Sequence, residues 1–210
     1  MVCILCAIGI VLGAEGTTGV LLSPEEIQGV GARYGEDAMK RVTAWQRLIK
    51  SSGGADEREK LVLVNNFFNQ IRYISDDRHW GQPDYWATPL EMLGTNGADC
   101  EDYAITKYLT LLELGVPDEK LRITYVKALT LNQAHMVLTY YSTPDAEPLI
   151  LDNLNRQVLG ASARQDLLPI YSFNGSGLWV SKGRGGSQSA GSSARLSRWQ
   201  DVKSKLKGGR

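Results

Sequence analysis

One cysteine of this chain lies among acidic residues, in the stretch GADCEDY. Asp99 precedes Cys100, and Glu101 and Asp102 follow it. Negative charge next to a thiol raises its pKa and makes it a weaker nucleophile. Two interpretations follow: Cys100 is an inert core thiol, or it is a nucleophile whose neighbouring carboxylates have a separate role.

The residues around Cys100 predict the start of a helix. Asp99 suits the N-cap position, and Asp102 completes a pair that resembles a capping box. Apolar residues follow at helical spacing, and Gly115 and Pro117 mark the end of the helix. A thiol in the first turn meets the positive end of the helix dipole, which favours the thiolate.

A histidine and an aspartate on neighbouring predicted strands supply a base and a partner for it. His135 opens the strand AHMVLTYY, and Asp152 lies in the next one, PLILDNL. A hairpin centred near residues 143–144 would place the two directly opposite, with Cβ atoms about 4.5–5.5 Å apart. Asp152 would then accept the Nδ1–H of His135. Together with Cys100, these are the parts of a Cys-His-Asp triad.

Simpler interpretations remain open for the same residues. His135 and Asp152 can be unrelated surface residues on an edge strand. His79, the other histidine, is a rival base that we expect in a loop. The aromatic residues from Trp80 to Trp86 either line a groove or cover the core. The backbone N–H of Cys100 and a side chain of this aromatic loop are candidates to bind an oxyanion.

The order of the predicted elements defines the fold class. Helices begin near Ser23 and continue to about residue 113, and strands with a period of two follow up to Val180. This order predicts an α+β fold, with the nucleophile at a helix N-terminus packed on an antiparallel sheet. We expect one domain over residues 23–181. The basic, Gly/Ser-rich tail of residues 182–210 reads as a flexible linker, followed by a short amphipathic helix or by a disordered end.

Composition restricts the function further. Hydrophobic residues make up 43% of the 210 residues and charged ones 22%, as in ordinary globular proteins. The tail holds eight of the 23 basic residues and one of the 23 acidic ones, so the rest of the chain is acidic and gives no sign of nucleic-acid binding. Residues 1–14 resemble a signal peptide, with an apolar run too short to span a bilayer. We therefore expect an exported protein that is not an integral membrane protein after signal removal.

Long segments of the chain resemble the bacterial transglutaminase-like cysteine peptidases of the LapG family. The resemblance runs from Tyr34 to Val180 and includes HWGQPDYWATPLEMLGTNGADCEDYAITKYLTLLELGVP, NQAHMVLTYY, LDNL and YSFNGSGLWV. It implies a papain/transglutaminase-like fold with Cys100 as nucleophile, His135 as base and Asp152 as the residue that orients the base.

The resemblance also implies a biological role. Members of this family are periplasmic proteases that cleave a large, LapA-like biofilm adhesin near its N-terminus, at a di-alanine site. The cut releases the adhesin from the cell surface. An inner-membrane c-di-GMP receptor of the LapD type sequesters the protease when c-di-GMP is high.

Calcium follows mainly from the resemblance. Matching the family motif to DCED implies Asp99, Glu101 and Asp102 as ligands of Ca²⁺. Carboxylate oxygens suit this ion, and its charge would offset the negative charge next to the thiol. The alternative is that these acids only cap the helix.

Two other function classes share these features. A transglutaminase or another acyltransferase would form the same acyl-enzyme. A non-catalytic, calcium-responsive binding module would need the acids but not the thiol.

Overall fold

The computed structural model describes residues 20–183 and 186–208, so the signal-peptide-like segment lies outside the described residues. The predicted helices are confirmed, and Ser23 and Asp56 cap theirs as expected. The α-helices are α1 (Pro24–Tyr34), α2 (Glu36–Ser52), α3 (Glu57–Phe68), α4 (Asp76–His79), α5 (Pro89–Thr95), α6 (Cys100–Glu113) and α7 (Ser197–Gly208).

An antiparallel sheet covers one side of the helices. Its strands run in the order β6-β5-β4-β3-β7-β8-β9. A second, two-stranded parallel sheet joins β1 (Arg72–Tyr73) to β2 (Gly97–Ala98). The strands of the large sheet are β3 (Leu121–Ala128), β4 (Gln133–Tyr140), β5 (Leu149–Leu151), β6 (Leu159–Gly160), β7 (Leu167–Phe173), β8 (Gly177–Ser181) and β9 (Ser187–Ser192). The predicted α+β class is confirmed.

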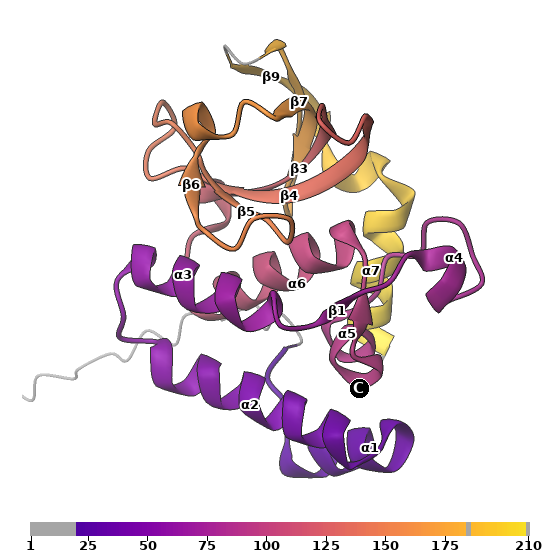
Figure 1. Ribbon diagram of the computed structural model, residues 1–210. Coiled ribbons are helices and arrows are strands. Elements are labelled where there is room, and N and C mark those ends of the chain that lie inside the picture. The colour runs from indigo at the N-terminus through magenta and orange to yellow at the C-terminus, as the bar shows by residue number, and fades with distance from the viewer. Residues whose placement is uncertain (1–19, 184–185, 209–210) are drawn as a thin grey trace, which may run out of the picture.

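Helix α6 forms the centre of the core. It lies against the middle of the sheet, with α3 and α2 on its other side (Figure 1). Its predicted apolar residues Ala104, Ile105 and Tyr108 are buried. Trp45 of α2 donates from Nε1 to the Thr110 hydroxyl at 3.0 Å, which satisfies two polar groups in this interior. The last turn of α6 is therefore bonded to α2, and the buried face of the helix fixes its place against the sheet.

The C-terminal segment corrects the prediction of a flexible linker. Residues 187–192 form β9, which pairs with β8 along the edge of the sheet. The alternative of an amphipathic helix is confirmed by α7, whose residues Trp199 and Val202 are buried in the main core. The Trp199 ring contacts those of Tyr108 and Phe173. The segment after residue 181 thus completes the domain.

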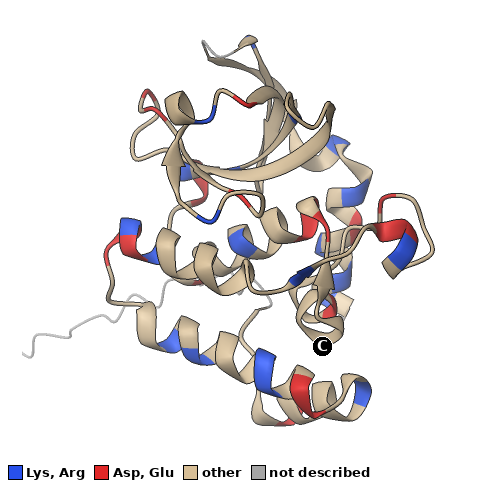
Figure 2. Cartoon of the chain, in the orientation of Figure 1, with Lys and Arg blue, Asp and Glu red and all other residues tan. Residues whose placement is uncertain are grey.

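Charge is unevenly distributed over the described residues. Acidic residues gather in and after α4 and at one end of α6, whereas basic residues are spread along α7 (Figure 2). No helix in the described part of the chain is long and apolar enough to cross a membrane.

Candidate active site and metal centre

Cys100 is the first residue of α6 and is partly buried. Its thiol donates to Glu101 Oε2 at 3.1 Å. Burial and, second to it, the Glu101 carboxylate raise the pKa of the thiol, whereas the backbone N–H of Met136 lowers it. Because Met136 follows His135 in β4, this contact brings the thiol to the strand that carries the histidine. Without a compensating charge, the thiol stays protonated.

His135 and Asp152 form a buried pair. His135 Nε2 donates to Asp152 Oδ1 at 2.8 Å, and the side chains are 3% and 0% exposed. The predicted contact is present, but the predicted register is wrong by two residues, because Leu138 pairs with Leu151 and Thr139 with Ile150. A shift of two keeps every side chain on its face, so the two residues still meet diagonally.

The bonded nitrogen also differs from the expectation. Nε2 of His135 faces Asp152, whereas the sequence analysis assigned this role to Nδ1. With Nε2 protonated and donating, the Nδ1 of a neutral ring is an acceptor. The histidine therefore has the tautomer of a base.

Arg164 holds the other oxygen of Asp152. Its Nη2 lies 2.7 Å from Asp152 Oδ2, and the guanidinium is fixed in turn by two bonds to Asp166. Burial raises the pKa of Asp152, but the hydrogen bonds from His135, the Leu154 N–H and Arg164 outweigh it and lower the pKa to about 2. Asp152 is therefore an ionised carboxylate, with Oδ1 bonded to His135 and Oδ2 bonded to Arg164.

A buried lysine is linked to the His135–Asp152 pair through an asparagine. Lys107 Nζ donates to Asn69 Oδ1 at 2.7 Å, and Asn69 Nδ2 donates to the backbone oxygen of Asp152 at 2.8 Å. Burial lowers the pKa of Lys107 to about 7, and the charge of Asp152 opposes this shift. Sequence reasoning missed Arg164, Asn69 and Lys107, because no motif or periodicity links them to the histidine.

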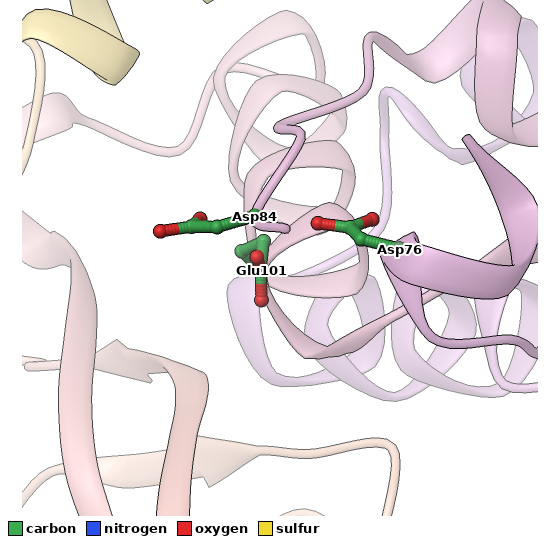
Figure 3. Close-up of side chains that lie close together, drawn as sticks. All are labelled: Asp76, Asp84 and Glu101. Carbon is green, nitrogen blue, oxygen red and sulfur yellow. The ribbon is translucent and has the colours of Figure 1, made fainter. Parts of the chain in front are cut away.

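The three acids predicted to bind metal divide between two overlapping clusters. Asp99 and Asp102 lie with Asp76, whereas Glu101 lies with Asp76 and Asp84. Figure 3 shows the second cluster, in which the α4 residue Asp76 and the loop residue Asp84 flank Glu101. The ligand atoms of each cluster lie within 4.8 Å of one another. Asp76 and Asp84 were missed because they come from α4 and from the loop after it, outside the DCED motif.

The clusters have the properties of a cation site. Among the described residues, Asp76 Oδ1 and Asp99 Oδ1 are buried oxygens without a hydrogen-bond partner. Burial, together with neighbouring carboxylates, raises the pKa of Asp76 to about 6 and that of Asp99 to about 10, and it raises the pKa of Asp102 well above its ordinary value. Crowded carboxylates with free oxygen lone pairs fit a hard cation such as Ca²⁺. The residues present therefore fit the ion.

The aromatic loop of residues 80–88 supports these acids through its backbone. The Ala87 N–H donates to Asp102 Oδ1 at 2.6 Å, and the Tyr85 N–H donates to Asp76 Oδ2. Trp86 is buried and stacks on Phe173, so its ring covers the core. For Trp86, covering the core is thus the correct alternative.

Residues of helix α7 bond to the same loop. Arg198 Nη2 lies 2.9 Å from Asp84 Oδ2. Lys205 donates to the Trp86 carbonyl at 2.9 Å and lies 3.6 Å from the centre of the Tyr85 ring. The basic residues of the C-terminal segment therefore reach the loop that carries the acids.

His79 is engaged elsewhere. Its Nε2 lies 2.9 Å from the Thr95 hydroxyl, and its ring packs on Trp80. The expectation of a plain loop residue is wrong in detail, because His79 ends the short helix α4. No carboxylate of the described residues forms an ion pair with it, in contrast to His135.

Fold and site together define a cysteine proteinase of the transglutaminase-like class. The chain belongs to the family described as bacterial transglutaminase-like cysteine proteinase BTLCP, which matches residues 37–182. The solved structures to which it is similar include Legionella pneumophila LapG after EGTA treatment, with 48% identity, a TM-score of 0.78, and coverage of 89% of this chain and 98% of that one. Calcium-bound Legionella pneumophila LapG is 47% identical, with a TM-score of 0.76 and coverage of 88% and 99%. A search of curated proteins found no match.

Proposed function

We propose that this protein is a calcium-dependent cysteine endopeptidase with Cys100, His135 and Asp152 as its triad. The observation that carries the proposal is the buried His135–Asp152 pair, together with a thiol at the N-terminus of α6 that meets the backbone N–H of Met136, the residue after His135. His135 Nδ1 takes the proton of the thiol, and Asp152 stabilises the imidazolium that forms. The thiolate attacks a peptide carbonyl, and His135 returns the proton to the leaving amine. Water then hydrolyses the thioester.

Calcium has a defined place in this proposal. Bound Ca²⁺ would supply positive charge next to the nucleophile, held by Asp99, Glu101 and Asp102 together with Asp76. Glu101 raises the pKa of the Cys100 thiol and also accepts its hydrogen bond. Engaging this carboxylate as a ligand would remove both effects. The calcium-bound state of the similar Legionella protein supports the assignment.

The resemblance to the LapG family supports a proposed substrate and a proposed mode of regulation. The proposed substrate is the N-terminal region of a large surface adhesin, cut at a di-alanine site in the periplasm. The cut releases the adhesin and promotes biofilm dispersal. An inner-membrane c-di-GMP receptor is the proposed inhibitor, acting by sequestration.

Cleavage of a purified adhesin fragment tests the proposal. The wild type should cut a fragment that contains the di-alanine site, with the product masses measured by mass spectrometry. EGTA should abolish the cut, and added Ca²⁺ should restore it. Cys100→Ala, His135→Ala and Asp152→Ala should be inactive, whereas His79→Ala should stay active because its ring binds Thr95. Full cleavage by Cys100→Ala would refute the triad.

Product chemistry separates the proposal from its alternatives. A peptidase yields a new amine and a new carboxylate, whereas an acyltransferase links glutamine to an added amine. A binding module would leave Cys100 unreactive toward iodoacetamide in the presence of calcium. Unchanged cleavage in excess EGTA would contradict the calcium requirement alone.

A further inference from the structure

A large cavity opens on the face of the sheet that points away from α6. Its volume is about 880 Å³, within the range of small-molecule sites. Alternate residues of β3 define the two faces: Ile123 is buried in the main core, whereas Arg122 and Val126 line the cavity. The cavity lies outside the acidic clusters and does not include Cys100.

Arg122 provides a cationic end. Its guanidinium lies between two rings, 4.0 Å from the Trp179 centroid and 4.7 Å from that of Tyr141. Its Nη1 donates to the Ser187 hydroxyl at 3.0 Å. Within the described part of the chain, no carboxylate pairs with Arg122, and its buried Nε has no acceptor. An arginine fixed in this way presents a planar set of donors that matches a carboxylate.

The other end of the cavity is mainly apolar, and Arg164, which also lines it, is paired with two carboxylates. Val126, Val137, Ile150 and Leu167 are each at most 6% exposed and belong to a small cluster separate from the main core. Four residues along β3, or about 13 Å, separate Val126 from Arg122. The cavity thus joins one unpaired cation to an apolar floor.

The acids that line the cavity do not neutralise Arg122. Asp145 and Glu147 belong to the β4–β5 connection and are exposed to water. Glu147 already accepts the backbone N–H of Ser162 at 2.6 Å. Water screens the charges of Asp145 and Glu147. The charge that a ligand meets near the two aromatic rings is therefore the positive charge of Arg122.

We propose that this cavity binds a small carboxylate with an unbranched apolar tail, with the carboxylate on Arg122 and the tail over the apolar floor. The site needs neither Cys100 nor the acidic clusters. Its test is a binding measurement, so its failure is distinguishable from failure of the proposed peptidase activity.

Calorimetry with octanoate, below its micelle concentration, tests the site. Octanoate should bind saturably with one site per chain. Butyrate should bind at least about tenfold more weakly, because it buries less apolar surface. Octan-1-ol should also lose at least about tenfold, because it keeps the tail but lacks the charge. Octanoate should shift the methyl NMR signals of Val126, Val137 and Ile150.

Matched variants locate the carboxylate. Arg122→Gln should weaken octanoate binding at least about tenfold, whereas Arg58→Gln, which removes an exposed arginine of α3, should leave it unchanged. If circular dichroism shows that Arg122→Gln is unfolded, Arg122→Lys keeps the charge without the planar donors and should give intermediate affinity. No saturable binding, equal binding of octanoate and octan-1-ol, or wild-type affinity in the folded Arg122 variant would each overturn the proposal.

Discussion

Replacing Arg164 with methionine removes the guanidinium from Asp152 but keeps a side chain of moderate length. The two groups form a 2.7 Å ion pair, with side chains 4% and 0% exposed. Removing one member of a buried pair typically costs about 3–5 kcal/mol, because the other charge stays buried. We expect about 3 kcal/mol for Arg164→Met, since His135 and the Leu154 N–H still bond to Asp152.

The pKa of Asp152 gives an independent, smaller figure. Its partners overcome burial and lower the pKa from 3.8 to about 2, a difference of about 2 kcal/mol. This is a net figure after the cost of burial, so we take the larger value for the loss of one partner. Because the pKa is depressed, this stability is present above pH 3.8 and is lost as the pH falls through about 2. Without Arg164 the pKa of Asp152 rises, so this carboxylate contributes less stability at neutral pH and the variant has less of that contribution to lose on acidification.

Urea unfolding at neutral and mildly acidic pH measures this effect. Arg164→Met should lose stability at both pH values and lose less at the acidic one, where its Asp152, with a raised pKa, takes up a proton that relieves the uncompensated buried charge. The acidic limb of the kcat/KM profile for the proposed peptidase activity should also move to higher pH, which a purely structural role would not cause. Asp166→Asn is the control, because this partner is 40% exposed and its loss leaves the Asp152 pair intact. If Arg164→Met unfolds within about 0.5 kcal/mol of the wild type and keeps its pH profile, the reasoning is wrong.

Three further predictions concern other parts of the molecule. Burial lowers the pKa of Lys107 from 10.5 to about 7, so between these pH values the unfolded chain binds more protons and the free energy of unfolding rises with pH. Lys107→Met should flatten this rise in urea titrations, and an unchanged slope would contradict the prediction. Asp76→Asn should weaken Ca²⁺ binding about tenfold or more in calorimetry, whereas Asp77→Asn, at an exposed neighbour outside both clusters, should not; equal affinities would exclude Asp76 as a ligand. Trp199→Ala should cost about 3–5 kcal/mol of unfolding free energy, because the ring is 1% exposed, and an unchanged melting curve would mean that α7 does not pack on the core in solution.

Local signals in the sequence predicted the positions of the helices and the place of Cys100 at the start of one of them. The N-caps Ser23, Asp56 and Asp99 occur where expected, because capping is decided by residues a few positions apart. The change of period after α6 predicted the strands for the same reason. The β4–β5 register was not predictable to better than two residues, because a shift of two exposes the same faces.

Other features depend on contacts that local patterns do not encode. Strand β9 reads SQSAGS and is mostly exposed, so it shows no apolar alternation and resembles a linker. Asp76 and Asp84 join Glu101 only through the path of the loop, and Asp84 has a positive φ of 86° that no spacing rule predicts. Arg164 reaches Asp152 from a turn after β6, and nothing in its neighbours indicates that contact.

The packing of α7 has a practical consequence for recombinant work. The family match ends at residue 182, before β9 and α7 begin. A fragment trimmed to that boundary would expose the aromatic surface of Phe173. It would also lose the contacts of Arg198 and Lys205 with the aromatic loop of residues 80–88. Such a fragment would aggregate readily and respond poorly to calcium, for reasons unrelated to the catalytic residues. Shortened versions of this protein should therefore keep the chain through residue 208.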